Sequence, residues 1–189
     1  MDTVKERLIR FRSFWIFPIL SALLLWSTAP ENHEGLGSQL FWSWAMGLFL
    51  WTIIEYFFHR VLLHVRLRNP TLQGLLNGQH TAHHTSPRDP SKILVKPLFG
   101  VLISAAIYGF LFWITGSAFR SAGVITGIWT GFLYYELVHY RVHMSLTHSP
   151  LLQWQRRAHF YHHFSNSSEC FGVTTPLWDY VFGTARSRH

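Results

Sequence analysis

The sequence has 189 residues, of which 49% are hydrophobic, 17% are aromatic and only 13% are charged. A soluble domain of this size carries about 25% charged residues, so the composition argues against a chain that is surrounded by water on every side. The only cysteine, Cys170, excludes an intrachain disulfide. The length predicts one domain, residues 1–189.

Four apolar stretches follow one another along the chain, at Phe14–Ala29, Leu40–Phe58, Pro97–Thr115 and Ala122–Val138. As helices they would be ~24 to 29 Å long, close to the ~30 Å of a bilayer core. They show no strand-like alternation, and so short a chain cannot enclose four buried helices. We therefore expect an all-α integral membrane protein with about four transmembrane helices, the first of them an uncleaved anchor.

Positive charge is distributed unevenly among the segments that flank these stretches. Fifteen of the sixteen Lys and Arg residues precede the first stretch, separate the second from the third, or follow the fourth; the exception is Arg120. The positive-inside rule places the charged side in the cytoplasm. We expect both termini there, with a helical cap formed by Val61–Lys96 and Arg141–His189. This orientation explains the net charge of +7 without a nucleic-acid partner.

Ten of the thirteen histidines form a pattern that occurs twice, a spaced pair followed by a triplet, on the expected cytoplasmic side. They are His59, His64, His80, His83, His84, His139, His143, His159, His162 and His163. Residues three and four apart share a helix face, so each triplet is expected to aim all its rings at one point. His33, His148 and His189 lie outside the pattern and are expected to be solvated.

The first pair is spaced differently from the second. His139 and His143 lie one helical turn apart, whereas His59 and His64 are five residues apart, which is ~140° around a regular helix. We therefore expect His59 and His64 to serve different ions, or the helix to end between them.

Ten ligands suit two ions with five nitrogens each. Imidazole binds zinc, copper, iron and nickel, but a structural zinc site is normally closed at four ligands and includes cysteine. Five nitrogens leave a position open, as O2 activation by iron requires. The pattern predicts two ions but does not identify the metal by itself, and zinc is able to occupy the same positions in a purified sample. The alternative of a metal-binding or metal-transport membrane protein fits less well, because transporters place their ligands near the bilayer midplane.

Two glutamates are candidates for supporting the ligands. Metal-bound histidines usually donate their second ring N–H to a carboxylate or a carbonyl. Glu55 and Glu136 lie four and three residues before His59 and His139, so they can reach the same helix faces.

Several motifs resemble the fatty acid hydroxylase superfamily of membrane proteins, and most closely the fatty acid 2-hydroxylases. The histidine spacing matches that family at all ten positions. The other matching residues are Glu55-Tyr56, Gly78-Gln79 before His80, Pro87 and Asp89, Tyr134–Tyr140, and Phe171–Thr184. The resemblance implies a di-iron, O2-dependent monooxygenase, and it adds Asp89 and Asp179 as supporting carboxylates.

The resemblance also implies a lipid substrate and an electron donor. The expected donor is a separate cytochrome b5-like protein or ferredoxin, because the chain begins a few residues before its first helix and contains no haem, flavin or nicotinamide motif. A site at the membrane interface favours C-2 of a fatty acid or sphingolipid acyl chain. Related families oxidise sterols, carotenoids or alkylglycerols, and these substrates remain alternatives.

Overall fold

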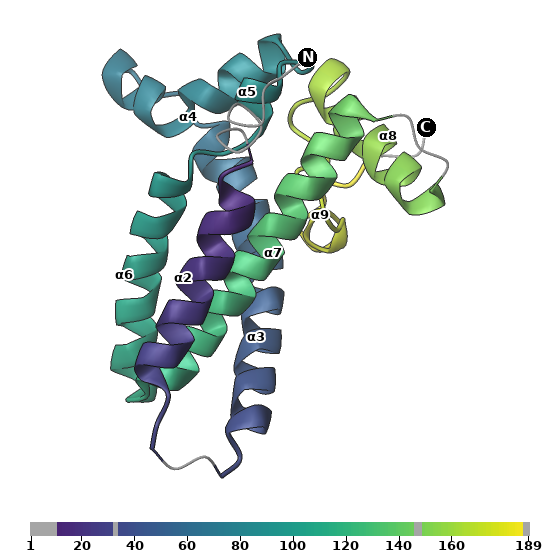
Figure 1. Cartoon of the computed structure of the whole chain (residues 1–189). Coiled ribbons are helices and arrows are strands. Elements are labelled where there is room, and N and C mark those ends of the chain that lie inside the picture. Colours follow the sequence, from purple (N-terminus) through teal and green to yellow (C-terminus); the bar gives the residue numbers. More distant parts are fainter. Residues whose placement is uncertain (1–10, 32–33, 146–148, 187–189) are drawn as a thin grey trace. The chain divides into compact units, whose positions relative to one another are not determined.

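The computed structural model describes residues 11–31, 34–145 and 149–186, and these residues form helices without any strand (Figure 1). Lys5, Arg7, Arg10, His33, His148, Arg188 and His189 lie outside the described residues. The helices are α2 (Ser13–Thr28), α3 (Leu36–Phe57), the π-helix η1 (Phe58–Leu63), α4 (Pro70–Thr85), α5 (Pro90–Ile93), α6 (Pro97–Thr115), α7 (Ala118–Met144), α8 (Pro150–Phe164) and α9 (Leu177–Val181).

The chain divides into two compact units. The first, here called the bundle unit, comprises Met1–Trp51 and Lys96–Leu133, and the second, the histidine unit, comprises Thr52–Val95 and Tyr134–His189. Helices α3 and α7 each begin in the bundle unit and continue into the histidine unit. The single domain expected from the chain length remains a prediction.

Prolines mark the beginning of four helices. Helices α4, α5, α6 and α8 all have proline at their first position, where the missing N–H removes no helical hydrogen bond. The Asn69 side chain caps α4 by accepting hydrogen bonds from the backbone N–H groups of Thr71 (2.9 Å) and Leu72 (3.1 Å). Helix α6 ends at Gly116, whose φ of 62° is a left-handed conformation that glycine adopts without strain.

In the bundle unit, α3 and α7 approach closely enough for their backbones to touch. Gly123, Gly127 and Gly131 are spaced four residues apart on α7 and face Ser43, Gly47 and Trp51 of α3. A Cβ atom on Gly127 would lie 2.1 Å from the carbonyl oxygen of Trp44, and one on Gly47 would lie 2.1 Å from that of Val124. Small residues at this spacing are typical of helices that pack within membranes.

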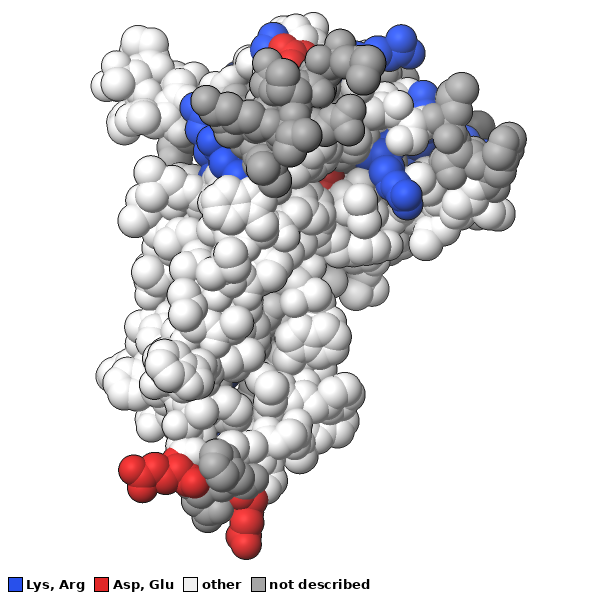
Figure 2. Space-filling view, in the orientation of Figure 1, with Lys and Arg blue, Asp and Glu red and all other residues white. Residues whose placement is uncertain are grey.

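Within the part of the chain that the structure describes, two segments are long and apolar enough to cross a membrane, Leu36–Leu63 and Pro90–Thr115. Only 22% and 6% of their most apolar windows are buried inside the protein, so their apolar side chains face outward, unlike those of a core helix in a soluble protein. Figure 2 shows a broad surface without Lys, Arg, Asp or Glu. Helix α2 is apolar but shorter, with 16 residues.

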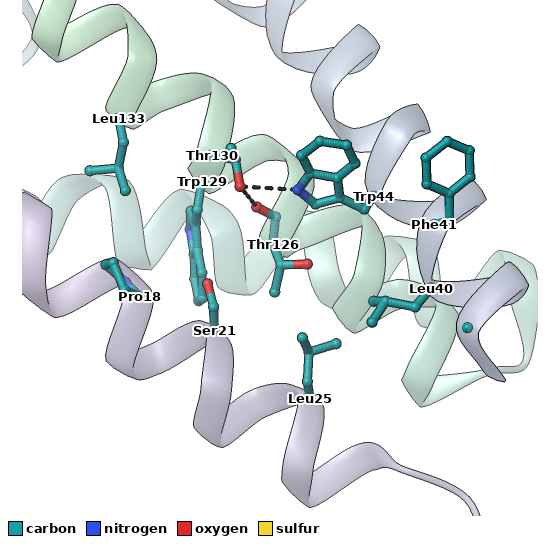
Figure 3. Close-up of a pocket in the computed structure, with 11 residues that line it drawn as sticks. Pro18, Ser21, Leu25, Leu40, Phe41, Trp44, Thr126, Trp129, Thr130 and Leu133 are labelled. Atoms are coloured by element: carbon teal, nitrogen blue, oxygen red, sulfur yellow. Dashed lines mark hydrogen bonds between the residues drawn. The ribbon is translucent and has the colours of Figure 1, made fainter. Parts of the chain in front are cut away.

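An open cavity of about 620 Å³ lies among α2, α3 and α7 of the bundle unit (Figure 3). Two of the polar groups in its wall are hydrogen-bonded within the protein. The Trp44 indole N–H donates to Thr130 Oγ1 (3.1 Å), and the Thr130 hydroxyl in turn donates to the backbone carbonyl of Thr126 (2.8 Å). The surface that remains is mainly apolar.

Candidate metal centre

All ten patterned histidines belong to the histidine unit and lie at or near the ends of its helices. His59 is in η1 and His64 directly follows it, the two triplets lie in the last turns of α4 and α8, and His139 and His143 are near the end of α7. Seven of the ten side chains are buried, and those of His64, His84 and His163 are half-buried.

The rings form two clusters of five. The first cluster contains His59, His64, His80, His84 and His162, and the second contains His83, His139, His143, His159 and His163. Within each cluster the candidate ligand nitrogens all lie within 4.8 Å of one another. The histidines that the sequence pattern singled out are thus the ones that the structure gathers.

The structure decides between the two expectations for the first pair. His59 and His64 do not belong to different clusters, since both rings lie in the first, and the helix does end between them, because η1 ends at Leu63. A π-helix places residue i+5 where an α-helix places residue i+4. Phe58–Leu63 has this geometry, so five residues return the chain to the same face.

The two triplets are divided between the clusters, which corrects the expectation that each would aim at one point. Helix α4 gives His80 and His84 to the first cluster and His83 to the second. Helix α8 gives His159 and His163 to the second and His162 to the first. Neighbouring residues in an α-helix differ by ~100° in direction, so the middle histidine of each triplet points away from the other two.

Distances between the Nε2 atoms match those of nitrogens around one ion. In the first cluster, His64 Nε2 lies 3.1 Å from the Nε2 atoms of both His80 and His162. In the second, the corresponding distances are 2.9 Å for His83–His139 and 2.8 Å for His143–His159. Two nitrogens that bind an ion at right angles, each at ~2.1 Å, are ~3.0 Å apart, so the rings are arranged as neighbouring ligands would be.

The two clusters adjoin each other. The ring of His84 in the first cluster stacks on the ring of His163 in the second, with centroids 4.1 Å apart and planes inclined by 11°. The rings of His80 and His83, one from each cluster, have centroids 6.2 Å apart. The arrangement is therefore one paired centre rather than two separate sites.

Backbone carbonyls orient two of the rings. His59 Nδ1 lies 2.6 Å from the carbonyl oxygen of Phe171, and His162 Nδ1 lies 2.8 Å from that of Glu169. A carbonyl only accepts, so Nδ1 carries the proton in both rings and Nε2 keeps its lone pair. This arrangement is typical of metal-bound histidine. The sequence motifs alone did not identify these carbonyls as functional groups.

Two carboxylates hold the loop that supplies one of these carbonyls. Glu55 accepts hydrogen bonds from the N–H groups of Val173 (2.7 Å) and Thr174 (2.9 Å) and from the Thr174 hydroxyl. Asp179 accepts from the N–H groups of Phe171 (2.9 Å) and Gly172 (2.8 Å). Both carboxylates are buried, and they fix the peptides on either side of the Phe171 carbonyl.

The other two candidate carboxylates contact α5 and the segment after it. Glu136 is buried and accepts a hydrogen bond from the Val95 N–H at 2.6 Å. Asp89 caps α5 by accepting from the N–H (3.0 Å) and the hydroxyl (2.7 Å) of Ser91, and it pairs with Lys92 at 3.5 Å. Both therefore stabilise the chain that follows α4.

Burial keeps the histidines neutral. It is the main cause that lowers the pKa of His83 and His162 from 6.5 to about 3. It also lowers the pKa of His64 to about 4, assisted by the neighbouring His84. Neutral imidazole is the form that binds metal ions, so these rings need no deprotonation to act as ligands at pH 7.

The donor set fits two transition-metal ions. Among the described residues, both ring nitrogens of His163 and Nε2 of His59 are buried without a hydrogen-bond partner. Burying an unpaired polar nitrogen is costly, and a metal ion would offset that cost. Both clusters contain nitrogen donors only, a set that suits zinc, copper, iron or nickel and excludes the oxygen cages of calcium and magnesium.

The fold and the site together define an all-helical protein with a paired polyhistidine centre. A family model for fatty acid hydroxylases matches residues 44–184. The chain belongs to the fatty acid hydroxylase family, and the resemblance inferred from its motifs is confirmed.

Similar proteins are named as 2-hydroxylases and ceramide hydroxylases. A dihydroceramide fatty acyl 2-hydroxylase of Arabidopsis thaliana is 30% identical over 180 residues, which is 90% of this chain and 73% of that protein. Human fatty acid 2-hydroxylase is 32% identical over 74% of this chain and 38% of its own length. A Saccharomyces cerevisiae ceramide very long chain fatty acid hydroxylase is 30% identical over 91% of this chain and 45% of its own length. The chain spans less than half of the last two relatives.

A solved structure has the same fold. The hydroxylase domain visible in full-length scs7p aligns with a TM-score of 0.76 at 26% identity, covering 92% of this chain and 66% of that one. The expectation of an all-α protein is confirmed.

Proposed function

We propose that this protein is a di-iron membrane monooxygenase that hydroxylates the acyl chain of a lipid at C-2. The observation that carries the proposal is the pair of adjoining five-histidine clusters in a chain of the fatty acid hydroxylase family. The ten clustered histidines are the proposed ligands. Two iron ions bound by them would supply the activation of O2.

The number of ligands favours oxygen chemistry over a structural metal site. Structural zinc sites are closed with four ligands, whereas each cluster offers five and leaves room for a sixth ligand in an octahedral arrangement. Zinc binds imidazole too, so we expect it to occupy the same positions when iron is scarce.

The remaining residues of the centre hold the ligands and limit access of water. Phe171 is buried, with its ring centroid 5.6 Å from those of His59 and His64 and 5.4 Å from that of His162. It covers one side of the first cluster with an apolar surface. We propose that Glu55 and Asp179 keep this loop in place, and that Glu136 and Asp89 position the chain next to α4.

The proposed membrane arrangement has four spans, namely α2, the Leu36–Leu63 segment, α6 and α7. The apolar outward-facing segments support this arrangement, as does the concentration of Lys and Arg in the polar segments that contain most of the histidines. Both termini and the metal centre would lie on the cytoplasmic side. Acyl substrates would then reach the centre from the bilayer with their polar end first.

The names of the relatives support C-2 as the reacting carbon, since two of them are called 2-hydroxylases. The proposed position of the centre at the membrane interface favours a carbon close to the head group over a mid-chain carbon. Electrons would come from a cytochrome b5-like protein or a ferredoxin, because the sequence contains no flavin or nicotinamide fingerprint.

Lipid mass spectrometry of cells with and without the protein tests this function. We expect acyl or ceramide species to gain one oxygen atom, which fragmentation places at C-2, and we expect His84→Ala to abolish the gain. Oxygen found only on sterols or carotenoids would contradict the acyl substrate assignment and would still agree with the proposed oxygenase chemistry. Metal binding without any oxygenated lipid, in cells that supply a donor, would favour a metal-binding protein.

A further inference from the structure

A second polar site lies along α8 and includes Arg186 near the end of the described chain. A depression of about 350 Å³ in the histidine unit is lined by three arginines, two aromatic residues and a serine: Arg156, Arg157, Phe160, Tyr161, Ser165 and Arg186. No acidic side chain lines it. Arg157 and Arg186 are exposed, so the pocket is open to a ligand from outside.

Two of the arginines are held in place before any ligand binds. The Arg156 guanidinium donates to the Ser145 carbonyl oxygen at 2.6 Å and lies 4.7 Å from the centroid of Phe160. The Arg186 guanidinium lies 4.7 Å from the centroid of Tyr161. Stacking on aromatic rings limits the conformational freedom of arginine, so less entropy is lost when it binds an anion.

The lining matches a phosphate group. Guanidinium groups bind phosphate oxygens through paired N–H donors, and the hydroxyls of Tyr161 and Ser165 add two further donors at the wall of the same pocket. Three positive charges in one depression, without a carboxylate, favour an anion over a neutral or zwitterionic ligand.

The pocket adjoins the second histidine cluster. The ring of Phe160, which forms part of its wall, lies 5.5 Å from the ring of His143, centroid to centroid. The Arg156 guanidinium is hydrogen-bonded to the carbonyl oxygen of Ser145, two residues after His143. A group bound in the pocket would therefore be close to the candidate metal centre.

We infer that this pocket binds the phosphate of a phospholipid headgroup, and that a phosphate-bearing lipid is the substrate whose acyl chain is hydroxylated. The inference rests on the proposed function and narrows its substrate class. The volume of about 350 Å³ suits a headgroup, because ligand pockets measure ~300 to 1,000 Å³. A protein partner would require a broader surface of ~800 Å².

The binding test uses the metal-loaded protein in a neutral detergent. Native mass spectrometry would follow the binding of dioleoyl phosphatidic acid, dioleoylglycerol and ceramide, with inorganic phosphate as a competitor. We expect the wild type to bind phosphatidic acid at least tenfold more tightly than the two lipids without phosphate. Arg157→Gln with Arg186→Gln should remove that preference.

A matched pair of substitutions controls for net charge. Arg66→Gln with Arg68→Gln removes the same two positive charges from exposed positions that do not line the pocket, and we expect this variant to bind phosphatidic acid within about twofold of wild type. Equal loss in both variants, equal binding of dioleoylglycerol, or displacement of the lipid by micromolar inorganic phosphate would overturn the inference. The last of these results would indicate a site for free phosphate.

Turnover separates this inference from the proposed function. We expect the wild type, supplied with reductant, to hydroxylate phosphatidic acid faster than ceramide, and Arg157→Gln with Arg186→Gln to raise KM for phosphatidic acid with little change in kcat. A wild type that prefers ceramide would overturn the inference and leave the hydroxylase function standing. Selective binding of phosphatidic acid without hydroxylation of any lipid would instead overturn the proposed function.

Discussion

At the scale of single residues, Asp179 acts on the candidate metal centre through the backbone. Its carboxylate accepts hydrogen bonds from two consecutive N–H groups, those of Phe171 and Gly172, and from the hydroxyl of Thr184 at 2.8 Å. The Phe171 carbonyl in turn accepts the Nδ1 proton of His59. A side chain that touches none of the clustered histidines thus sets the direction of the His59 ring, a proposed ligand.

Replacing Asp179 by asparagine should therefore weaken metal binding. The amide group has one acceptor atom in place of two, so at least one of the three donors loses its partner. We expect a 10- to 100-fold loss of metal affinity, the usual size of such indirect effects, measured by competition with a chromogenic chelator.

The control for this change is Glu31→Gln, which removes a carboxylate from an exposed position in the bundle unit and should leave the affinity unchanged. Circular dichroism would show whether the variant retains its helices. Wild-type metal affinity in folded Asp179→Asn protein would contradict the role assigned to this side chain.

The lowered pKa values of the histidines predict how the metal-free protein responds to acid. His83 and His162 have an ordinary pKa of 6.5, which burial lowers to about 3 in the fold. Between these values the unfolded chain binds more protons than the folded one, so the free energy of unfolding rises with pH. Each histidine contributes up to ~1.4 kcal/mol per pH unit in this window.

Chemical unfolding of the metal-stripped protein in detergent, followed at pH 5 and pH 7, measures this dependence. We expect lower stability at pH 5, and a shallower dependence after His83→Gln with His162→Gln. A stability that stays constant from pH 7 to pH 5 would show that the rings are accessible to protons in the folded state.

At the scale of helices, the contact between α3 and α7 depends on glycine. Gly127→Ala places a methyl group 2.1 Å from the Trp44 carbonyl oxygen, and the nearest atoms are backbone that cannot rotate away. The helices must separate, and the cost of such overpacking is ~1 to 3 kcal/mol. We expect a lower midpoint of thermal unfolding in detergent.

Gly109→Ala is the matched control, because it makes the same chemical change in a helix where no atom lies within 4 Å of the added Cβ. That variant should be neutral or slightly more stable, since alanine favours helix over glycine by ~0.5 to 1 kcal/mol. Equal midpoints for the two variants would mean that the close approach of α3 and α7 contributes little to stability.

The sequence predicted the helices more accurately than the sharing of ligands between them. Apolar length identified Pro97–Thr115 to the residue, because a proline begins α6 and Gly116 ends it. Spacing identified all ten clustered histidines. It did not reveal the π-helix at Phe58–Leu63, since that geometry arises from packing and leaves no simple periodicity. Nor did it show that His83 and His162 each lie in a different cluster from the other two histidines of their triplets, because this division depends on how α4 and α8 face each other.

The roles of the supporting carboxylates were predictable only in part, because spacing shows which residues share a helix face and not what they contact. The four-residue spacing predicted that Glu55 could reach the helix face of His59 and accept its ring N–H, but that N–H is bound to the Phe171 carbonyl. The groups that Glu55 binds, at Val173 and Thr174, are more than 100 residues away in sequence. No local pattern encodes such a contact, so its existence required the structure.

At the scale of the whole molecule, the distribution of charge predicts the orientation in the membrane. Glu31 lies between the first and second apolar stretches, in a segment without Lys or Arg. Arg68 lies between the second and third stretches, in a segment rich in both. The positive-inside rule therefore predicts opposite sides for these two positions.

Single-cysteine variants test this orientation in intact cells. The native Cys170 is buried, and Cys170→Ser provides a background without thiols. Glu31→Cys should react with a membrane-impermeant maleimide from outside, and Arg68→Cys should react only after permeabilisation. Labelling of Arg68→Cys in intact cells would contradict the proposed topology and indicate the opposite orientation.

The division of both triplets between the two clusters has a consequence for how the centre is assembled. An ion bound by His80 and His84 would immobilise α4, and α4 also carries His83 of the other cluster. Part of the conformational entropy that the second ion would otherwise have to overcome is thus lost when the first ion binds. Loading should therefore be cooperative and reciprocal, so that damage to one cluster weakens occupancy of the other. In a metal titration followed by native mass spectrometry, the empty and doubly loaded forms should dominate at half-saturation, whereas two equal and independent sites would leave half of the protein singly loaded.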